Sequence, residues 1–252
     1  MIRVTLSDLS VNRGDRDVLK DISLSVHSGE FIGLIGPNGA GKTTLMRAAL
    51  GLLPHRGTSS LARLSAPERA RAAAWLPQAR EIAWPVSVEK VVLLGRIPHL
   101  ASLQQAGEAD FQALEDVLRE MDLQHLRHLP ATELSGGEQA RVLIARALAQ
   151  QTPLVLADEP IAGLDPAHQI TTMQTFANLA AKGISSLVSL HDLGLAVRHC
   201  SRLILLGQGA LVADGPPQEV MTPERLKEVF GISAFYETTQ QGPVYQSLEV
   251  LR

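Results

Sequence analysis

One glycine-rich stretch places the tightest limit on how this chain can fold. It fits the phosphate-binding pattern G-x-x-x-x-G-K-[ST] at every fixed position and reads Gly36, Pro37, Asn38, Gly39, Ala40, Gly41, Lys42, Thr43, Thr44. Residues 31–35 before it form an apolar run of strand length, and Leu45, Ala49 and Leu52 recur after it at helical spacing. Strand, glycine loop and helix in this order let backbone N–H groups turn inward to phosphate oxygens, and the helix N-terminus adds positive partial charge.

Two side chains of this loop suit a nucleoside triphosphate. The ammonium group of Lys42 is expected to reach the β- and γ-phosphates, and the hydroxyl of Thr43 to ligate Mg²⁺. The alternative is a glycine turn that only introduces a helix. The complete pattern, in its place between a strand and a helix, favours the phosphate site.

Composition argues against several other classes of protein. Lys and Arg number 23 against 26 Asp and Glu, and a net charge of −3 gives no sign of a nucleic-acid partner held by bulk charge. The single cysteine, Cys200, cannot form an internal disulfide, which agrees with a reducing cytosol. No apolar run approaches the roughly 18 residues of a membrane span, and the N-terminus lacks the apolar core of a signal peptide. We therefore expect a soluble protein inside the cell, whose membrane role would come through a partner.

The 252 residues are expected to form one domain with an α/β core and a helical insert. Strand patterns cover residues 1–35, and the apolar run 154–157 is typical of a strand buried on both faces. Residues 86–150 look helical, and one stripe in them is expected to face a core: Phe111, Leu114, Val117, Leu118, Met121. We assign 1–78 and 151–252 to the core and 79–150 to the insert.

An acidic pair, Asp158 and Glu159, directly follows the apolar run 154–157. An acidic residue at the end of a buried parallel strand lies on the edge where α/β sheets bind ligands. Asp158 is expected to hold Mg²⁺, and Glu159 to take a proton from an attacking water. The alternative is an Asp-Glu pair that caps a helix, and the glycine loop favours the catalytic interpretation.

A second glycine segment precedes the helical run 140–149 and reads Leu134, Ser135, Gly136, Gly137, Glu138, Gln139. Two glycines at a helix start again offer free N–H groups and a helix dipole, which together make an anion site. On its own the segment would be interpreted as a turn with a serine N-cap. One phosphate site needs only one such loop, so we expect this one to reach the same phosphate from the opposite side, across a dimer.

These elements, in this order, resemble the nucleotide-binding subunit of an ATP-binding cassette (ABC) transporter over nearly the whole chain. The most specific match is the segment 134–139. The other matching motifs are the loop 36–44, the segment Asp158-Glu159-Pro160, the D-loop Gly163-Leu164-Asp165, the switch histidine His191 with Asp192, and the Q-loop glutamine Gln78. The resemblance implies a P-loop NTPase (RecA-like) core with a small antiparallel β-subdomain and an inserted α-helical subdomain.

The resemblance also implies how such a subunit works. It would hydrolyse ATP with Mg²⁺ in a sandwich dimer, expected here to be a homodimer, in which ATP on one protomer meets Ser135, Gly136 and Gly137 of the other. Asp165 would lie near the nucleotide, His191 would contact the γ-phosphate, and Gln78 would link the metal site to the insert. The partners would be integral membrane permease subunits and, indirectly, a periplasmic substrate-binding protein. The subunit would be cytoplasmic, held at the inner face of the cell membrane by the permease.

Looser matches at 84–89, 94–99 and 226–232 resemble importers of iron–siderophore, haem and cobalamin compounds. An importer of another substrate, such as a metal ion, is the alternative within the family. A soluble non-transport cassette protein would carry long coiled coils or two cassettes. A small-molecule kinase would not need the segment 134–139, and Glu159 argues against a regulatory module that binds ATP without hydrolysis.

Two departures from the family pattern carry predictions. The family usually places an aromatic residue near position 13 to stack on adenine, and this chain has Arg13 there. We expect the planar guanidinium of Arg13 to lie on the base instead. The segment 54–75 is also several residues short, which predicts a truncated hairpin in the small β-subdomain.

Overall fold

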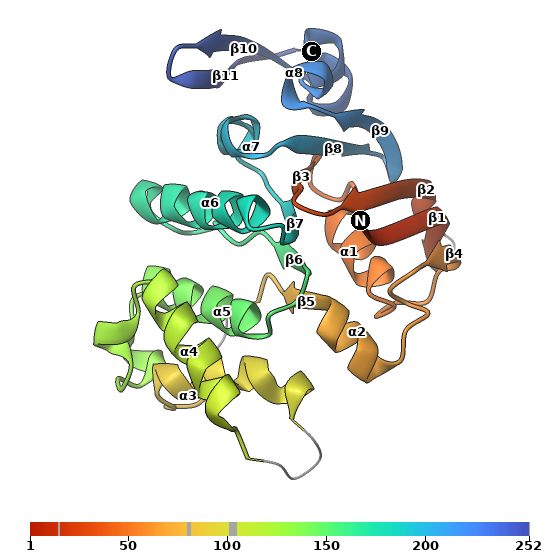
Figure 1. Cartoon of the computed structure of the whole chain (residues 1–252). Helices are drawn as coiled ribbons and strands as arrows, with labels where there is room; N and C mark the ends of the chain where they lie inside the picture. The colour runs from red at the N-terminus through yellow and green to blue at the C-terminus, as the bar shows by residue number, and fades with distance from the viewer. Residues whose placement is uncertain (15, 80–81, 101–104, 252) are drawn as a thin grey trace.

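The computed structural model describes residues 1–14, 16–79, 82–100 and 105–251, and its centre is a mixed β-sheet (Figure 1). Within these residues the sheet has six strands, in the spatial order β5 (Ala73–Leu76), β6 (Leu154–Asp158), β7 (Ser185–Ser189), β3 (Phe31–Ile35), β8 (Arg202–Gly207) and β9 (Ala210–Gly215). Neighbouring strands are parallel except for β8 and β9. The carboxyl ends of the parallel strands therefore meet along one edge.

Two hydrophobic cores lie on opposite faces of this sheet. In β3, Phe31 and Ile35 belong to one core and Ile32 and Leu34 to the other, because successive side chains of a strand point to opposite faces. β6 is buried along its whole length, which confirms the strand expected at 154–157. The first core is covered by the helices α3 (Val88–Leu93), α4 (Glu108–Glu120), α5 (Gly136–Ala149), α6 (Pro166–Ala181), α7 (Leu193–His199) and α8 (Pro217–Val220).

The second core is closed by α1 (Lys42–Ala49) and by a small antiparallel sheet. In this sheet β1 (Ile2–Arg13) lies between β2 (Arg16–His27) and β4 (Arg56–Ser59), which confirms the β-subdomain. The predicted face of α1 is correct for Leu45 and Ala49. It is wrong for Leu52, which is 48% exposed, because the helix ends before Gly51 at φ +66°.

The truncated hairpin expected at 54–75 is wrong. In this fully described segment β4 is followed by a turn and then by the helix α2 (Ala66–Ala72), not by a returning strand. The local sequence explains the helix, because Ser65 and Glu68 form a capping box and Pro67 stands in the first turn.

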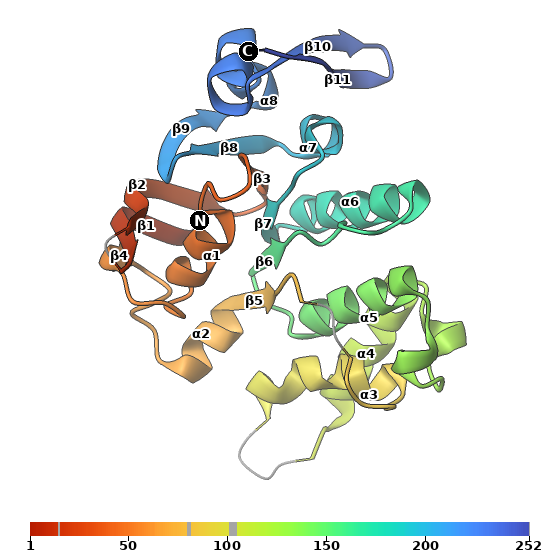
Figure 2. The same cartoon turned by 180° about the vertical axis from the view of Figure 1, so that it is seen from behind.

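The helices α3, α4 and α5 lie together beyond β5, at the end of the molecule opposite the C-terminal strands (Figures 1 and 2). Val88, Val91 and Val92 of α3 are buried. The stripe on α4 is confirmed for its other members, but Phe111 is 48% exposed. The neighbouring Asp110 takes the inward position of the first turn, where it accepts a hydrogen bond from Arg96 Nε at 2.9 Å.

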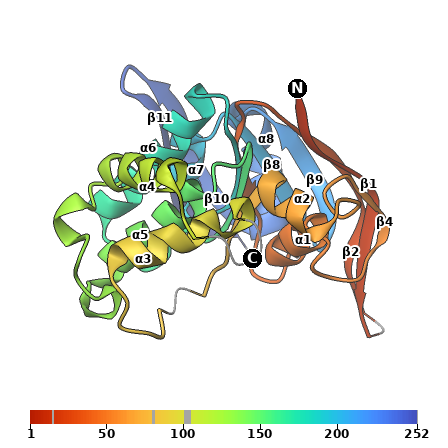
Figure 3. The same cartoon turned by 60° about the horizontal axis from the view of Figure 1, so that its bottom comes forward.

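Short 3₁₀ helices complete the insert at Leu94–His99, Gln124–Leu126 and Ala131–Glu133. The predicted insert also spans residues 80–81 and 101–104, which lie outside the described residues, and its boundaries stay a prediction. Figure 3 shows the insert and the antiparallel sheet of β1, β2 and β4 on opposite flanks of the central sheet. None of the described helices has the length and hydropathy needed to cross a membrane.

The C-terminal part forms a hairpin that the sequence analysis missed. After α9 (Pro223–Arg225) and a π-helical turn (Leu226–Phe230), the strands β10 (Ile232–Thr239) and β11 (Gly242–Val250) pair in antiparallel register. The hairpin packs on α7, and a Cβ on Gly194 would lie 3.6 Å from the carbonyl oxygen of Tyr245. It therefore covers the helix that follows His191.

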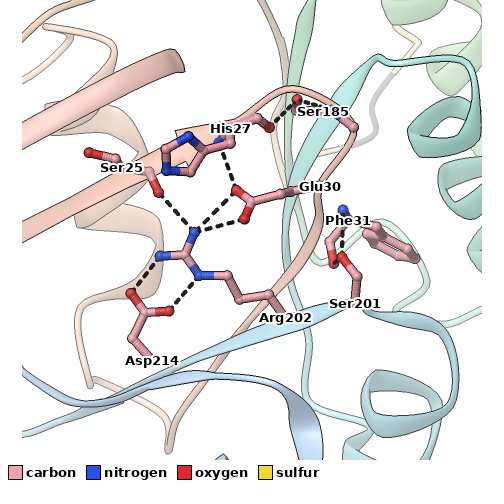
Figure 4. A network of polar contacts seen from close by, with 9 residues as sticks. Ser25, His27, Glu30, Phe31, Ser185, Ser201, Arg202 and Asp214 are labelled. Atoms are coloured by element: carbon pink, nitrogen blue, oxygen red, sulfur yellow. Dashed lines mark hydrogen bonds and ion pairs between the residues drawn. The ribbon is translucent and has the colours of Figure 1, made fainter. Parts of the chain in front are cut away.

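Arg202 ties the N-terminal edge of the central sheet together (Figure 4). It donates to both carboxylate oxygens of Asp214 at 2.5 and 2.6 Å, to Glu30 at 3.1 Å, and to the carbonyl of Ser25 at 2.9 Å. The hydrogen bonds to Asp214 raise the pKa of Arg202 above its ordinary value. One guanidinium thus joins β2, the turn before β3, β8 and β9.

Candidate nucleotide-binding site

The loop 36–44 runs from the end of β3 into the first turn of α1 and depends on its glycines. Gly36, Gly39 and Gly41 have φ angles of 149°, 80° and 101°. A Cβ on Gly36 would lie 2.4 Å from the carbonyl oxygen of Leu206, and one on Gly41 would lie 2.6 Å from Cδ2 of Leu19. Only glycine permits this backbone and this close approach to β8 and β2.

Lys42 points back into the loop. It is 7% exposed, and its Nζ donates to the carbonyl of Gly36 at 2.7 Å and to that of Pro37 at 3.3 Å. Burial lowers the pKa of Lys42, and the charges of Glu159 and Asp158 oppose that shift. A phosphate oxygen would offer this ammonium a full negative charge in place of two carbonyl dipoles.

The loop forms one wall of a cavity of about 1010 Å³, a volume suited to a nucleotide. Beyond the loop, the lining residues come from the β1–β2 hairpin, the end of β6 and the β8–β9 turn: Arg13, Arg16, Asp17, Val18, Lys20, Glu159, Gln208, Gly209. Arg13 and Arg16 are register partners at the hairpin tip. None of the described lining residues is aromatic.

Asp158 is the last residue of β6 and is 1% exposed. Its Oδ1 accepts a hydrogen bond from Ser189 Oγ at 2.6 Å, while its buried Oδ2 has no hydrogen-bond partner among the described residues. Buried carboxylate oxygens are normally satisfied, and Mg²⁺ prefers oxygen ligands such as carboxylates and hydroxyls. The residues present therefore fit a magnesium site.

Glu159 lies where three strand ends converge. Its Oε1 is 2.6 Å from Nε2 of His191, which follows β7, and its Oε2 accepts from Nε2 of Gln78, which follows β5, at 2.8 Å. Its backbone has φ +49°, and its N–H donates to Ser189 Oγ at 2.8 Å. Residues far apart in the sequence thus surround one carboxylate beside the glycine loop.

The remaining predicted residues lie elsewhere. Ser135 caps α5 and Asp165 caps α6, and the Asp165 carboxylate also lies 2.5 Å from Nδ1 of His168. Gly137 packs on His168, where a Cβ would lie 3.1 Å from Nδ1. Of the described residues that line the cavity, none comes from 134–139 or 163–165.

Ser189 was missed by the sequence analysis, although it contacts both acidic residues. A hydroxyl two residues before a candidate histidine, at the end of the predicted strand 186–190, was the available signal. Arg16 and Val18 were also missed, because their place opposite the loop depends on how the hairpin of β1 and β2 folds over it.

A family model described as "ABC transporter" matches residues 19–162. The hemin import ATP-binding protein HmuV of Pseudomonas fluorescens (strain Pf0-1) is 42% identical over 242 residues, which cover 92% of this chain and 93% of the relative. HmuV of Rhodococcus jostii is 40% identical over 229 residues, which cover 88% and 78%.

Solved structures agree on the fold. One of a metal-chelate type ABC transporter in an inward-facing conformation matches with a TM-score of 0.87 at 24% identity, and covers 99% of this chain and 98% of that one. An ATP-binding cassette in a dimeric post-hydrolysis state with ADP and phosphate matches with a TM-score of 0.72 at 25% identity, and covers 85% and 98%.

Proposed function

The chain belongs to the ABC transporter family of ATP-binding cassettes, and from this premise we propose that it is the ATPase subunit of an importer for haem or a similar metal chelate. Relatives that are 40–42% identical along most of its length are hemin import ATP-binding proteins, which supports the cargo class. The observation that carries ATP hydrolysis is the convergence of Gln78, Glu159 and His191 beside the glycine loop.

Binding of ATP begins at the loop 36–44. Its backbone N–H groups and the N-terminus of α1 take the phosphates, and Lys42 exchanges its two carbonyl partners for the β- and γ-phosphates. Thr43, Asp158 and Gln78 are the residues that would hold Mg²⁺. When bound, this ion neutralises charge on the phosphates.

Hydrolysis then depends on the carboxylate of Glu159. It accepts the proton of the water that attacks the γ-phosphate, while His191 contacts that phosphate. In the structure Gln78 and His191 both contact this carboxylate. We infer that ATP draws His191 towards the γ-phosphate, which leaves one carboxylate oxygen for the water.

The site is completed by a second subunit. Ser135, Gly136, Gly137 and Asp165 lie outside the cavity of their own chain, and we infer that they face the nucleotide of an identical copy. The closing and opening of this dimer would drive a membrane permease, which a periplasmic binding protein supplies with substrate. The subunit would work on the cytoplasmic side, bound to the permease.

The substitution Glu159→Gln tests the catalytic part of this proposal. The amide cannot accept the water's proton, so hydrolysis should stall while ATP binding is kept, and size-exclusion chromatography with Mg-ATP should show a dimer. Glu237→Gln, which changes an exposed side chain of β10, is the matched control and should turn over ATP normally. Normal turnover by Glu159→Gln, or a monomer with Mg-ATP, would refute the mechanism.

A growth experiment tests the cargo separately. Deletion of the gene should abolish growth on haem as the sole iron source and leave growth on a ferrous salt intact. Wild-type growth on haem would reject the cargo and leave the ATPase assignment standing.

A further inference from the structure

Ser189 connects the two acidic residues of the site through one hydroxyl. It is the last residue of β7 and is fully buried. Its Oγ lies 2.6 Å from Oδ1 of Asp158 and 2.8 Å from the backbone nitrogen of Glu159. The neighbouring strands explain the contact, because Ser189 and Asp158 are register partners in the pair β6–β7.

The direction of both hydrogen bonds follows from the groups involved. An ionised carboxylate can only accept, and a backbone N–H can only donate. The hydroxyl therefore donates to Asp158 and accepts from Glu159. One atom thus acts as donor and acceptor at the same time. Only a residue that keeps a hydroxyl at this position can make both hydrogen bonds in the same way.

Each bond restrains a group that the chemistry needs. The bond to Asp158 sets the rotation of a carboxylate whose other oxygen, Oδ2, is buried without a partner in the described part of the chain. The bond to Glu159 anchors a backbone with φ +49°, a conformation that a residue with a Cβ adopts at an energetic cost. That backbone turn aims the Glu159 carboxylate at His191 and Gln78.

We propose that Ser189 is a positioning residue for the ATPase reaction, which orients Asp158 towards the divalent cation and holds Glu159 in its catalytic conformation. The inference rests on the proposed function of this site. It goes beyond that function, because it assigns the coupling between cation binding and the general base to one hydroxyl on the neighbouring strand β7.

The same strand offers a matched control in Ser186. It is also fully buried, but its Oγ has no hydrogen-bond partner within the described ranges. Ser186→Ala removes a buried hydroxyl from β7 and breaks no described hydrogen bond of that group. Ser189→Ala removes the same atom, and with it the hydroxyl that hydrogen-bonds to the N–H of Glu159 and to Oδ1 of Asp158.

Three variants, Ser189→Ala, Ser189→Thr and Ser186→Ala, should be compared with the wild type in steady-state ATPase assays. For Ser189→Ala we expect kcat to fall by about tenfold or more, with KM for ATP changed by less than about threefold. Ser189→Thr keeps the hydroxyl and should retain at least about half of the wild-type kcat. Ser186→Ala should behave as the wild type.

A binding measurement tests the cation part without turnover. A fluorescent ATP analogue is titrated into each protein in EDTA and again at increasing Mg²⁺. In EDTA, Ser189→Ala should bind as the wild type, because Lys42 and the loop are intact. The Mg²⁺ concentration that gives half of the change in affinity should rise by about fivefold or more for this variant alone.

Thermal unfolding in the absence of nucleotide identifies variants that fail to fold. The proposal is overturned if folded Ser189→Ala matches Ser186→Ala in kcat and in its Mg²⁺ dependence, or if folded Ser189→Thr loses as much activity as Ser189→Ala. If the wild type itself hydrolyses no ATP, the proposed function fails, and the Mg²⁺ titration still reports on the orientation of Asp158.

Discussion

Arg13 is expected to take the place of an aromatic residue against the adenine base, and Arg13→Tyr tests this. Arg13 lies at the end of β1 and lines the nucleotide cavity together with Arg16 and Val18, whereas none of the described lining residues is aromatic. A guanidinium can lie flat on a purine ring, but at an exposed site it holds its position weakly.

The expected gain follows from comparing the two contacts. An exposed cation–π contact contributes about 0.5–1 kcal/mol, and an aromatic ring stacked on a base contributes roughly 1–3 kcal/mol. The difference of about 1 kcal/mol corresponds to a roughly fivefold lower Kd for ATP. Arg13→Ala should raise Kd by about two- to fivefold. Since neither contact reads the edge of the base, the wild type should distinguish ATP from GTP by less than about tenfold.

Titration of a fluorescent ATP analogue into wild type, Arg13→Tyr and Arg13→Ala measures these changes. Arg56→Ala is the control, because Arg56 is an exposed arginine of the same antiparallel sheet and does not line the cavity. Equal affinities in all four proteins would mean that Arg13 does not touch the base. Tighter binding by Arg13→Ala would mean that Arg13 weakens ATP binding, the opposite of the expected contact.

Four further perturbations follow from the structure. Lys42→Ala should abolish hydrolysis and sharply weaken ATP binding. Turnover near the wild-type rate would mean that the loop 36–44 is not part of the active site. His191→Ala should slow turnover while ATP affinity is largely kept, which the same titration checks; turnover at the wild-type rate would contradict its role at the γ-phosphate. Arg202→Ala should lower the free energy of unfolding in urea by about 2–4 kcal/mol, because Asp214 loses the two hydrogen bonds that it accepts from Arg202 and Glu30 keeps only the one from the His27 N–H. A change as small as that of exposed Arg198→Ala would refute the role of the network. The Gly107 N–H and Arg96 hold the pKa of Asp110 below its usual range. The ionised carboxylate therefore stabilises the fold above about pH 3.9, and this contribution is lost as the pH falls through the lowered pKa. Asp110→Asn should flatten the acid side of the plot of unfolding free energy against pH, and an unchanged plot would contradict this.

Much of the fold could be predicted because its signals are local. The buried strand at 154–157 and the glycine loop each depend on residues within one short segment. Errors arose where neighbours distant in sequence decide the outcome. Phe111 has the right spacing for the core, but Asp110 takes the inward position because it forms a buried hydrogen bond with Arg96. The C-terminal hairpin is stabilised by packing on α7, which its own sequence does not reveal.

The candidate site divides in the same way. The roles of Lys42, Asp158 and Glu159 could be predicted from the sequence. Residue type and position after a strand indicate a phosphate or metal role, and no knowledge of distant contacts is needed for that prediction. Ser135 and Asp165 carry an equally clear pattern, but within one chain they cap helices away from the cavity.

Only the tertiary structure decides which residues meet at the carboxylate of Glu159. Long stretches of chain separate β5, β6 and β7, and their pairing side by side in the sheet brings Gln78 and His191 to the carboxylate of Glu159. Parallel pairing of β6 and β7 in register places Ser189 beside Asp158. The sequence by itself determines which groups are available, because chemistry belongs to single residues. Strand order and register determine their distances, and these are set by burial of both sheet faces over the whole domain, a property that no single segment encodes.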